Sequence, residues 1–216
     1  MANKPHASTG TDIDVFWDGR LCIHVEECVR AHSEVFEKGR KPWAMPDAGP
    51  AEEAAEVCER CPTGAMTYVR KDGGPQESAP DVNTVVIAND GPLYLSGDLE
   101  IEGAGENMEG VSFRAALCRC GESSKKPFCD GSHANAEFAD SGAVGNASPG
   151  AEGTGGPLSV KLAKDGPLLL AGNFRLVTGP GRVAWEGSKA ALCRCGKSAN
   201  KPFCDGTHKA AGFKSD

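Results

Sequence analysis

The sequence predicts an α+β protein in which an N-terminal α/β unit precedes two β-rich repeats that pack with pseudo-twofold symmetry. The main observation is a sixteen-residue motif that starts at Cys118 and returns at Cys193, at a constant offset of 75 residues, with 12 of 16 positions identical. Short β-prone runs precede both copies. The first 72 residues instead indicate a strand, a cysteine loop, two helices and a second strand.

Composition narrows the class of protein. The 216 residues carry a net charge of −7 and show no basic patch of the kind that binds nucleic acid. The N-terminal residues lack the apolar run of a secretory signal, and no stretch approaches the roughly 20 apolar residues of a membrane span. Ten cysteines without an export signal indicate metal ligands rather than disulfides. We therefore expect a cytoplasmic protein that binds neither membrane nor nucleic acid.

The first 72 residues are expected to comprise a disordered tail, 1–12, and a folded unit, 13–72. The runs 13–17 and 66–70 are rich in β-branched, aromatic and other apolar residues and predict strands. Helices are predicted at 29–36 and 50–60, the second because Pro50 and acidic residues occupy its first turn. The loop from Cys22 to Cys28 lies between the first strand and the first helix.

Two stretches rich in small residues and turn formers, 73–81 and 140–156, are predicted linkers. The first linker precedes repeat 1, at 82–139, and the second separates repeat 1 from repeat 2, at 157–214. In repeat 1, strands are expected at 83–88, 93–97 and 111–117, the last leading into Cys118. Each repeat of about 55 residues is near the lower limit for independent folding, so the two halves are expected to share or exchange strands.

The residues of the motif are soft metal ligands. Each copy carries three Cys and one His, and thiolates select zinc, copper(I) or iron–sulfur clusters. A closed tetrahedral zinc site is one possibility, but such sites usually pair ligands as Cys-x2-4-Cys, whereas Cys118 and Cys120 are separated by one residue. The second pair is Cys129 and His133. Two pairs suit a 2Fe–2S cluster, in which each of the two irons needs two protein ligands.

The pattern Cys-x-Cys-x2-Ser-x3-Pro-x-Cys-Asp-Gly-(Ser/Thr)-His resembles the signature of CDGSH iron–sulfur proteins, the mitoNEET-like family, and both copies fill every signature position. The resemblance implies a β-rich fold and a role in electron transfer or cluster donation. It also implies a monomer whose two motifs imitate the dimer of one-motif members. The implied ligands of two 2Fe–2S clusters are Cys118, Cys120, Cys129 and His133 in repeat 1, and Cys193, Cys195, Cys204 and His208 in repeat 2.

The N-terminal unit resembles a divergent single-cluster ferredoxin. Bacterial ferredoxins use Cys-x2-Cys-x2-Cys with a distant Cys-Pro; here Cys22-x5-Cys28 lacks the middle cysteine, and Cys61-Pro62 is the distant element. Three ligands, Cys22, Cys28 and Cys61, suit a 3Fe–4S cluster. A 4Fe–4S cluster needs a fourth, which Cys58 or His24 could supply; otherwise Cys58 is a small buried residue and His24 a packing or supporting one. Zinc is the alternative for this unit too.

Residues beside the ligands have expected roles. Asp130 and Asp205 are predicted to cap short helices that hold the histidines and direct backbone amides at an anionic cluster. Ser123 and Ser198 either donate hydrogen bonds to cluster sulfurs or only shape a turn. Pro127 and Pro202 are expected to stiffen the approach to the second ligand pair.

No nucleotide-binding loop or nucleophilic triad is recognisable, so we expect a protein that is not an enzyme. The leading hypothesis is an electron carrier, working with redox partner proteins, in which electrons run from the N-terminal centre to the two repeats. The alternatives are an iron–sulfur cluster donor serving apo acceptors, a redox or pH sensor, and a zinc-stabilised interaction module. A histidine ligand also predicts cluster loss on acidification, because metal-bound imidazole must be unprotonated.

Overall fold

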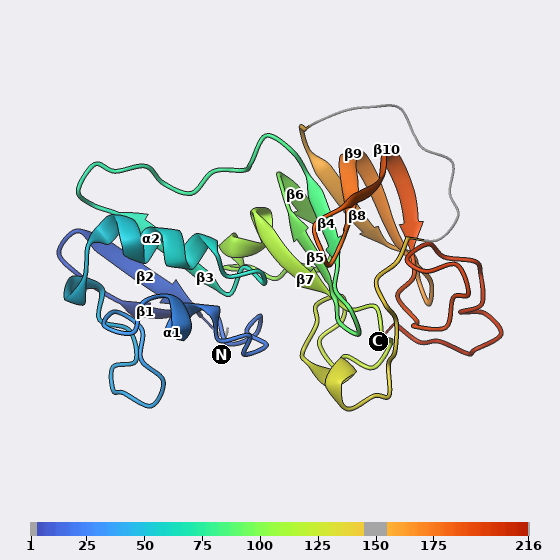
Figure 1. The fold of residues 1–216 in the computed structure, drawn as a ribbon, viewed down its shortest axis with the longest axis horizontal. Coiled ribbons are helices and arrows are strands. Elements are labelled where there is room, and N and C mark those ends of the chain that lie inside the picture. Colours follow the sequence, from blue (N-terminus) through green and yellow to red (C-terminus); the bar gives the residue numbers. More distant parts are fainter. Residues whose placement is uncertain (1–3, 145–154, 216) are drawn as a thin grey trace.

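A computed structural model describes residues 4–144 and 155–215. The chain forms two units side by side, an N-terminal one built around a small sheet and a larger one built around a second sheet (Figure 1). Strands dominate and helices are few and short. The two motif loops lie at the same end of the larger sheet (Figure 1). Among the described residues, no helix is long and apolar enough to cross a membrane.

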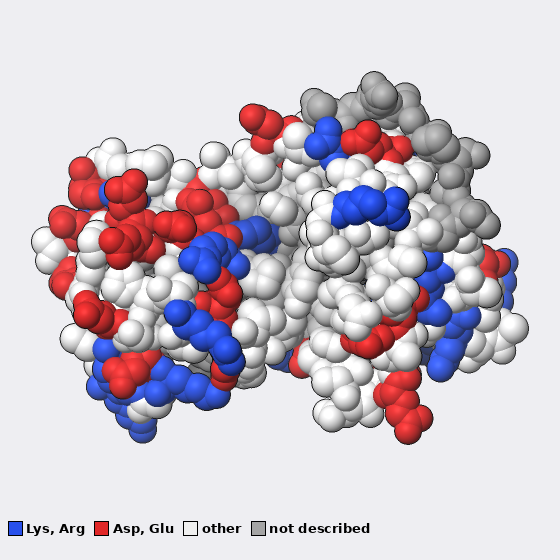
Figure 2. Space-filling model, in the orientation of Figure 1, with Lys and Arg blue, Asp and Glu red and all other residues white. Residues whose placement is uncertain are grey.

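The N-terminal unit is a three-stranded antiparallel sheet with α2 packed on it. Its core joins alternate sheet residues, such as Ile13 and Val15, to Ala54 and Val57 on one face of α2. Figure 2 shows acidic side chains gathered over the α2 side of this unit. The elements are β1 (His6–Ser8), β2 (Ile13–Trp17), α1 (Glu27–Ala31), the 3-10 turn η1 (Pro46–Ala48), α2 (Ala51–Glu59) and β3 (Met66–Arg70).

The predicted strands at 13–17 and 66–70 are confirmed, and the helix predicted at 50–60 is confirmed as α2. The prediction of a disordered tail over 1–12 is wrong for residues 6–8, which pair with β2, because β2 has a free edge that accepts a third strand. The helix predicted at 29–36 is displaced: α1 spans Glu27–Ala31, and Phe36 instead forms a β-bridge with Ala44.

The larger unit holds one seven-stranded sheet to which both repeats contribute. Its apolar core runs continuously through both repeats, from Val85 and Leu95 to Leu168 and Phe174. Residues 111–117 divide into a 3-10 turn and a strand, where the sequence predicted one strand. The elements are β4 (Thr84–Ile87), β5 (Leu93–Ser96), β6 (Leu99–Ile101), η2 (Glu109–Ser112), β7 (Arg114–Leu117), η3 (Ser132–Ala134), β8 (Leu158–Leu162), β9 (Leu168–Thr178) and β10 (Val183–Leu192).

Strands of each repeat pair with strands of the other. β4 of repeat 1 lies parallel to the second half of β9, with Thr84 opposite Arg175. β6 of repeat 1 lies parallel to β8 of repeat 2, with Glu100 opposite Ser159. Ser159 is the repeat 2 equivalent of Thr84, and Arg175 is the repeat 2 equivalent of Glu100, each at the offset of 75 residues. The two pairings are therefore one contact, made once from repeat 1 to repeat 2 and once from repeat 2 to repeat 1. The expected exchange of strands is therefore present in the sheet.

The segment 73–81 has no helix or strand, as expected of a linker, but it is not free of contacts. Glu77 forms an ion pair with Arg114, and both side chains are at most 10% exposed. Of the second predicted linker, 140–156, residues 145–154 lie outside the described residues. Asp140, at its start, is bonded to Arg119.

Candidate metal centres

Each motif folds back on itself as soon as its last strand ends. β7 ends at Leu117, and the Cys118 amide donates to Pro127 while the Cys129 amide donates to Ala116, at 2.9 and 2.8 Å. The two bonds return the second half of the motif to the first. In repeat 2 the same bonds join Cys193 to Pro202 and Cys204 to Ala191, at 2.7 and 2.8 Å.

This folding places the ligand side chains in pairs. The Cys118 and Cys120 sulfurs lie 3.7 Å apart, and the Cys129 sulfur lies 3.3 Å from His133 Nδ1. In repeat 2 the corresponding distances are 3.7 Å between the Cys193 and Cys195 sulfurs and 3.4 Å between the Cys204 sulfur and His208 Nδ1. Two thiolates on one tetrahedral metal at about 2.3 Å stand about 3.8 Å apart. Each pair therefore fits one metal atom.

The charges in repeat 1 suit metal binding. A hydrogen bond from the Cys120 thiol lowers the pKa of Cys118 to about 6, while the same contact and burial raise the pKa of Cys120. Burial raises the pKa of Cys129 to about 11. Burial also lowers the pKa of His133, which favours the neutral imidazole that a metal needs. Cys118 therefore loses its proton readily. The buried thiols of Cys120 and Cys129 keep theirs unless a metal cation takes the place of the proton.

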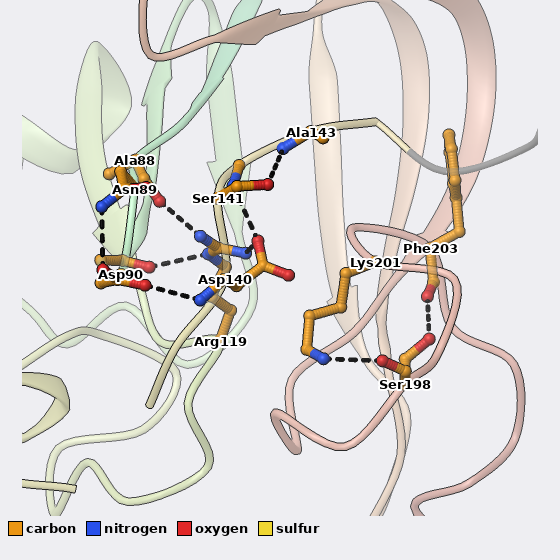
Figure 3. Close-up of polar contacts among 12 residues, drawn as sticks. Ala88, Asn89, Asp90, Arg119, Asp140, Ser141, Ala143, Ser198, Lys201 and Phe203 are labelled. Atoms are coloured by element: carbon orange, nitrogen blue, oxygen red, sulfur yellow. Dashed lines mark hydrogen bonds and ion pairs between the residues drawn. The ribbon is translucent and has the colours of Figure 1, made fainter. Parts of the chain in front are cut away.

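The structure corrects the helix-capping role expected for Asp130, and it shows which of the two expected roles Ser123 and Ser198 take. Asp130 accepts the Ser132 amide at 2.9 Å and the Ser124 amide at 2.8 Å, so it ties two loops together; only the three-residue turn η3 follows it, not a helix. Ser123 donates to the Phe128 carbonyl at 2.6 Å, the turn-forming role rather than a bond to a cluster. Ser198 does the same to Phe203, as Figure 3 shows.

One arginine of each motif was missed by sequence reasoning, although Cys-Arg-Cys is identical in both copies. Arg119 is 2% exposed and forms an ion pair with Asp140 (Figure 3). It also donates to the Gly91 carbonyl, and its guanidinium lies over the Phe138 ring. Arg194 is also 2% exposed and donates to the carbonyls of Gly166 and Ala163. Arg119 therefore holds the loop before β5 against the ligand-bearing turn of repeat 1, and Arg194 holds the loop before β9 against that of repeat 2.

The two motifs touch through their backbones. Gly121 and Gly196 each follow the second cysteine of a motif and have φ of 93° and 75°. A Cβ on Gly121 would lie 2.9 Å from the Cys195 carbonyl oxygen, and one on Gly196 would lie 2.5 Å from that of Cys120. Only glycine allows this approach without displacement of the neighbour. The two candidate centres are therefore in direct contact through their ligand loops.

Three of the four cysteines of the N-terminal unit line one cavity of about 260 Å³. Cys22, Cys28 and Cys61 all line it, and so does His24, whose Nδ1 lies 3.9 Å from the Cys22 sulfur. Its remaining wall is largely apolar, with Trp17, Trp43 and Val29 among the lining residues. Three thiols converging on an apolar cavity match the soft donors of an iron–sulfur cluster.

The two candidates for a fourth ligand, Cys58 and His24, differ in their position relative to the cavity. Cys58 is 0% exposed and is not among the residues lining the cavity, and burial raises the pKa of its thiol. It packs in the core beneath the sheet, with Met66 and Ala54. His24 lines the cavity in a left-handed conformation, at φ 57°. Among the described residues, no group of three or more His, Cys, Asp or Glu is gathered closely enough to hold a single metal ion.

Comparisons with known families agree with both kinds of site. The family described as divergent 4Fe-4S mono-cluster matches residues 8–71. The family described as iron-binding zinc finger CDGSH type matches residues 90–134 and 165–209, one match over each motif. The chain belongs to the CDGSH-type iron-binding family. It carries a divergent 4Fe-4S mono-cluster domain ahead of the two CDGSH repeats.

Two proteins of Escherichia coli are similar to part of the CDGSH protein. One, from strain K12, is named YjdI and described as uncharacterized; it is 40% identical over 63 residues, which cover 29% of this chain and 83% of that protein. The YjdI of strain O157:H7 matches with the same figures. The family assignment confirms the predicted order of an iron–sulfur domain followed by two CDGSH repeats, and the chain is an iron–sulfur protein.

Proposed function

We propose that this CDGSH protein carries single electrons among three iron–sulfur centres and is not an enzyme. Each CDGSH repeat holds a 2Fe–2S cluster on three Cys and one His, and the N-terminal cavity holds a 3Fe–4S or 4Fe–4S cluster. When bound, these clusters supply one-electron redox chemistry. The proposed ligands are Cys118, Cys120, Cys129 and His133; Cys193, Cys195, Cys204 and His208; and Cys22, Cys28 and Cys61.

The observation that carries this proposal is the pairing of the ligands. Each pair has the spacing of two ligands on one metal atom, and each repeat supplies two pairs. Two irons need that arrangement, whereas one zinc ion needs four ligands around a single point. The reciprocal pairing of Thr84 with Arg175 and of Ser159 with Glu100 supports packing of the repeats as an internal pseudo-dimer in a monomeric chain.

Contact between the sites favours electron transfer. The ligand loops meet at Gly121 and Gly196, so two centres lie within one packed region. Histidine ligation removes one negative charge from each CDGSH cluster and raises its potential above that of all-Cys plant-type clusters, about −400 mV. Electrons are then expected to run from the N-terminal centre to the repeats. A redox titration that places the N-terminal centre above both others would contradict this direction.

Cluster donation is the second candidate, and one observation favours it. His133 and His208 are both partly exposed, while Cys118 and Cys193 are buried. A thiol of an apo acceptor could therefore approach the histidine side of a CDGSH cluster first. Incubation with an apo-ferredoxin distinguishes the two candidates, because transfer within minutes supports donation and retention of all iron supports electron transfer.

The decisive test is the iron, sulfide and zinc content of anaerobically purified protein, together with its EPR spectra. The proposal predicts about seven or eight irons per chain with matching sulfide, from two 2Fe–2S clusters and one 3Fe–4S or 4Fe–4S cluster. An EPR signal in the oxidised state favours 3Fe–4S. About three zinc ions with no sulfide would overturn the proposal and leave a zinc-stabilised interaction module.

A further inference from the structure

Arg114, in β7 of repeat 1, reaches into the N-terminal unit. A guanidinium has five N–H donors, and the five hydrogen bonds of Arg114 occupy every nitrogen of its side chain. It donates to the Cys58 and Cys61 carbonyls, at 2.6 and 2.5 Å, and to the Met66 carbonyl at 2.9 Å. The other two bonds join both carboxylate oxygens of Glu77, at 2.7 and 2.8 Å.

These bonds place a cation at the end of α2, where backbone carbonyls lack helical partners. Arg114 is 6% exposed, so its charge is little screened by water. Cys61 is both a carbonyl partner of Arg114 and one of the three thiols that line the N-terminal cavity. The loop that presents this proposed ligand is therefore held by a side chain of repeat 1.

The surrounding interface is closely packed. A Cβ on Gly110 would lie 2.0 Å from the Gly64 carbonyl oxygen, and one on Gly64 would lie 2.3 Å from that of Arg114. Cys22 and Cys61 both pack against the hydrophobic core shared by the repeats. Two of the cysteines that line the N-terminal cavity therefore lie at the interface with the repeats.

The same strand leads to the first CDGSH site. β7 continues from Arg114 to Leu117 and is followed at once by Cys118, and Ala116 accepts the Cys129 amide. Tyr94 lies opposite Ala116 in the neighbouring strand β5. Burial raises the pKa of its phenol, and the charges of Cys129 and Cys61 raise it further. Tyr94 therefore interacts electrostatically with one proposed ligand of each centre.

Repeat 2 offers no equivalent contact. Arg114 is opposite Ser96 in the sheet, and the residue in the same register of repeat 2 is Lys189, opposite Ala171. Lys189 is exposed. Lys189 therefore has the same strand position as Arg114 but no link to the N-terminal unit.

We propose that Arg114 is a positioning residue that fixes the N-terminal centre against repeat 1, so that electrons pass from that centre to repeat 1. The inference rests on the proposed function. A single electron passes between the two sites, oxidising the N-terminal centre and reducing that of repeat 1, and no bond is made or broken. The Arg114 cation and the Glu77 carboxylate set opposite electrostatic biases on the N-terminal centre.

The test is a redox titration of the holoprotein, followed by EPR, for Arg114→Met, Glu77→Gln and the control Lys189→Met. Loss of the cation in Arg114→Met should lower the reduction potential of the N-terminal centre by about 59 mV. At a fixed solution potential, the ratio of reduced to oxidised centre should then fall about tenfold. Glu77→Gln should shift the same potential upward. Magnetic coupling between the N-terminal and repeat 1 centres should weaken in Arg114→Met, and Arg114→Lys should restore the potential but only part of the coupling.

Opposite shifts in the two interface variants, with Lys189→Met unchanged, support the inference, because general loosening would move both potentials in one direction. If Arg114→Met does not fold, the sign of the Glu77→Gln shift decides. Three centres with potentials unchanged in both variants would overturn the inference and leave the proposed function standing. A wild-type protein without iron and sulfide would instead remove the proposed function itself.

Discussion

The buried Arg119 forms an ion pair with the partly buried Asp140 in repeat 1, and repeat 2 does not reproduce this pair. The position equivalent to Asp140 is Ser215, whose amide and hydroxyl bond to Asp165 instead. Among the described residues, Arg194 has carbonyl partners and the Phe213 ring but no carboxylate in an ion pair, and burial lowers its pKa. Repeat 2 therefore keeps a buried positive charge that repeat 1 neutralises.

This asymmetry predicts that the two CDGSH centres have different reduction potentials, with repeat 2 the more easily reduced, because an unneutralised cation stabilises the added electron. Ser215→Asp should lower the potential of repeat 2, and Asp140→Ser should raise that of repeat 1. Each shift should amount to about tenfold in reduced fraction at fixed potential. Spectroscopically monitored redox titration measures both.

The double variant Asp140→Ser with Ser215→Asp is the control, since it exchanges the two environments without changing total charge. It should reverse the order of the two potentials. Identical potentials in the wild type would show that these arginines do not influence the clusters.

Replacing His133 by Cys tests the proposed ligand set of repeat 1. The substitution exchanges a neutral nitrogen ligand for a thiolate, so the potential of that cluster should fall. Nitrogen hyperfine coupling in pulsed EPR should drop to the contribution of His208 alone. His6→Ala, at an exposed strand position, is the matched control. An unchanged nitrogen signal in His133→Cys would mean that another group binds the iron.

Cys58 and Cys61 are predicted to behave differently, although only two residues separate them. Cys61 lines the N-terminal cavity and Cys58 does not. Cys61→Ser should therefore remove the N-terminal EPR signal with about three or four irons. Cys58→Ala should keep the full iron content and cost roughly 1 kcal/mol of unfolding free energy, from the lost packing. Loss of the N-terminal signal in Cys58→Ala would make Cys58 a ligand after all.

Asp130→Asn should loosen the second ligand pair. Burial raises the pKa of Asp130, but hydrogen bonds from Ser132 and Ser124 outweigh burial and hold the pKa well below its usual range. Because the folded-state pKa is depressed, this carboxylate contributes stability that is present above about pH 3.9 and is lost as pH falls through the folded pKa. Losing the charge should cost about 1 kcal/mol after allowance for solvent screening.

Chemical denaturation at pH 7 and at pH 3 checks this sign. The difference between Asp130→Asn and wild type should be constant from pH 5 to pH 8 and shrink below about pH 4. A difference that grows on acidification would mean that the carboxylate is not held ionised.

Much of the molecule could be predicted from local pattern. The strands at 13–17 and 66–70, the helix at 50–60 and the strands before Cys118 follow from residue preferences over a few positions, and the structure contains them. The ligand pairs could be predicted because their residues are close in sequence and repeat at a fixed offset. Polar neighbours were predicted less well: Ser123 had two open roles, and only the position of the Phe128 carbonyl shows which one its hydroxyl takes.

The sequence by itself determined which residues are soft ligands, how they are spaced and that the motif is duplicated, because those properties belong to short stretches of chain. Only the tertiary structure decided that Arg114 holds the Cys61 loop, that Arg119 has a carboxylate partner and that Gly121 meets Cys195. These contacts join residues 53, 21 and 74 positions apart. Their physical cause is the packing of whole strands, which fixes every side chain along an edge at once and leaves no local signature in the sequence.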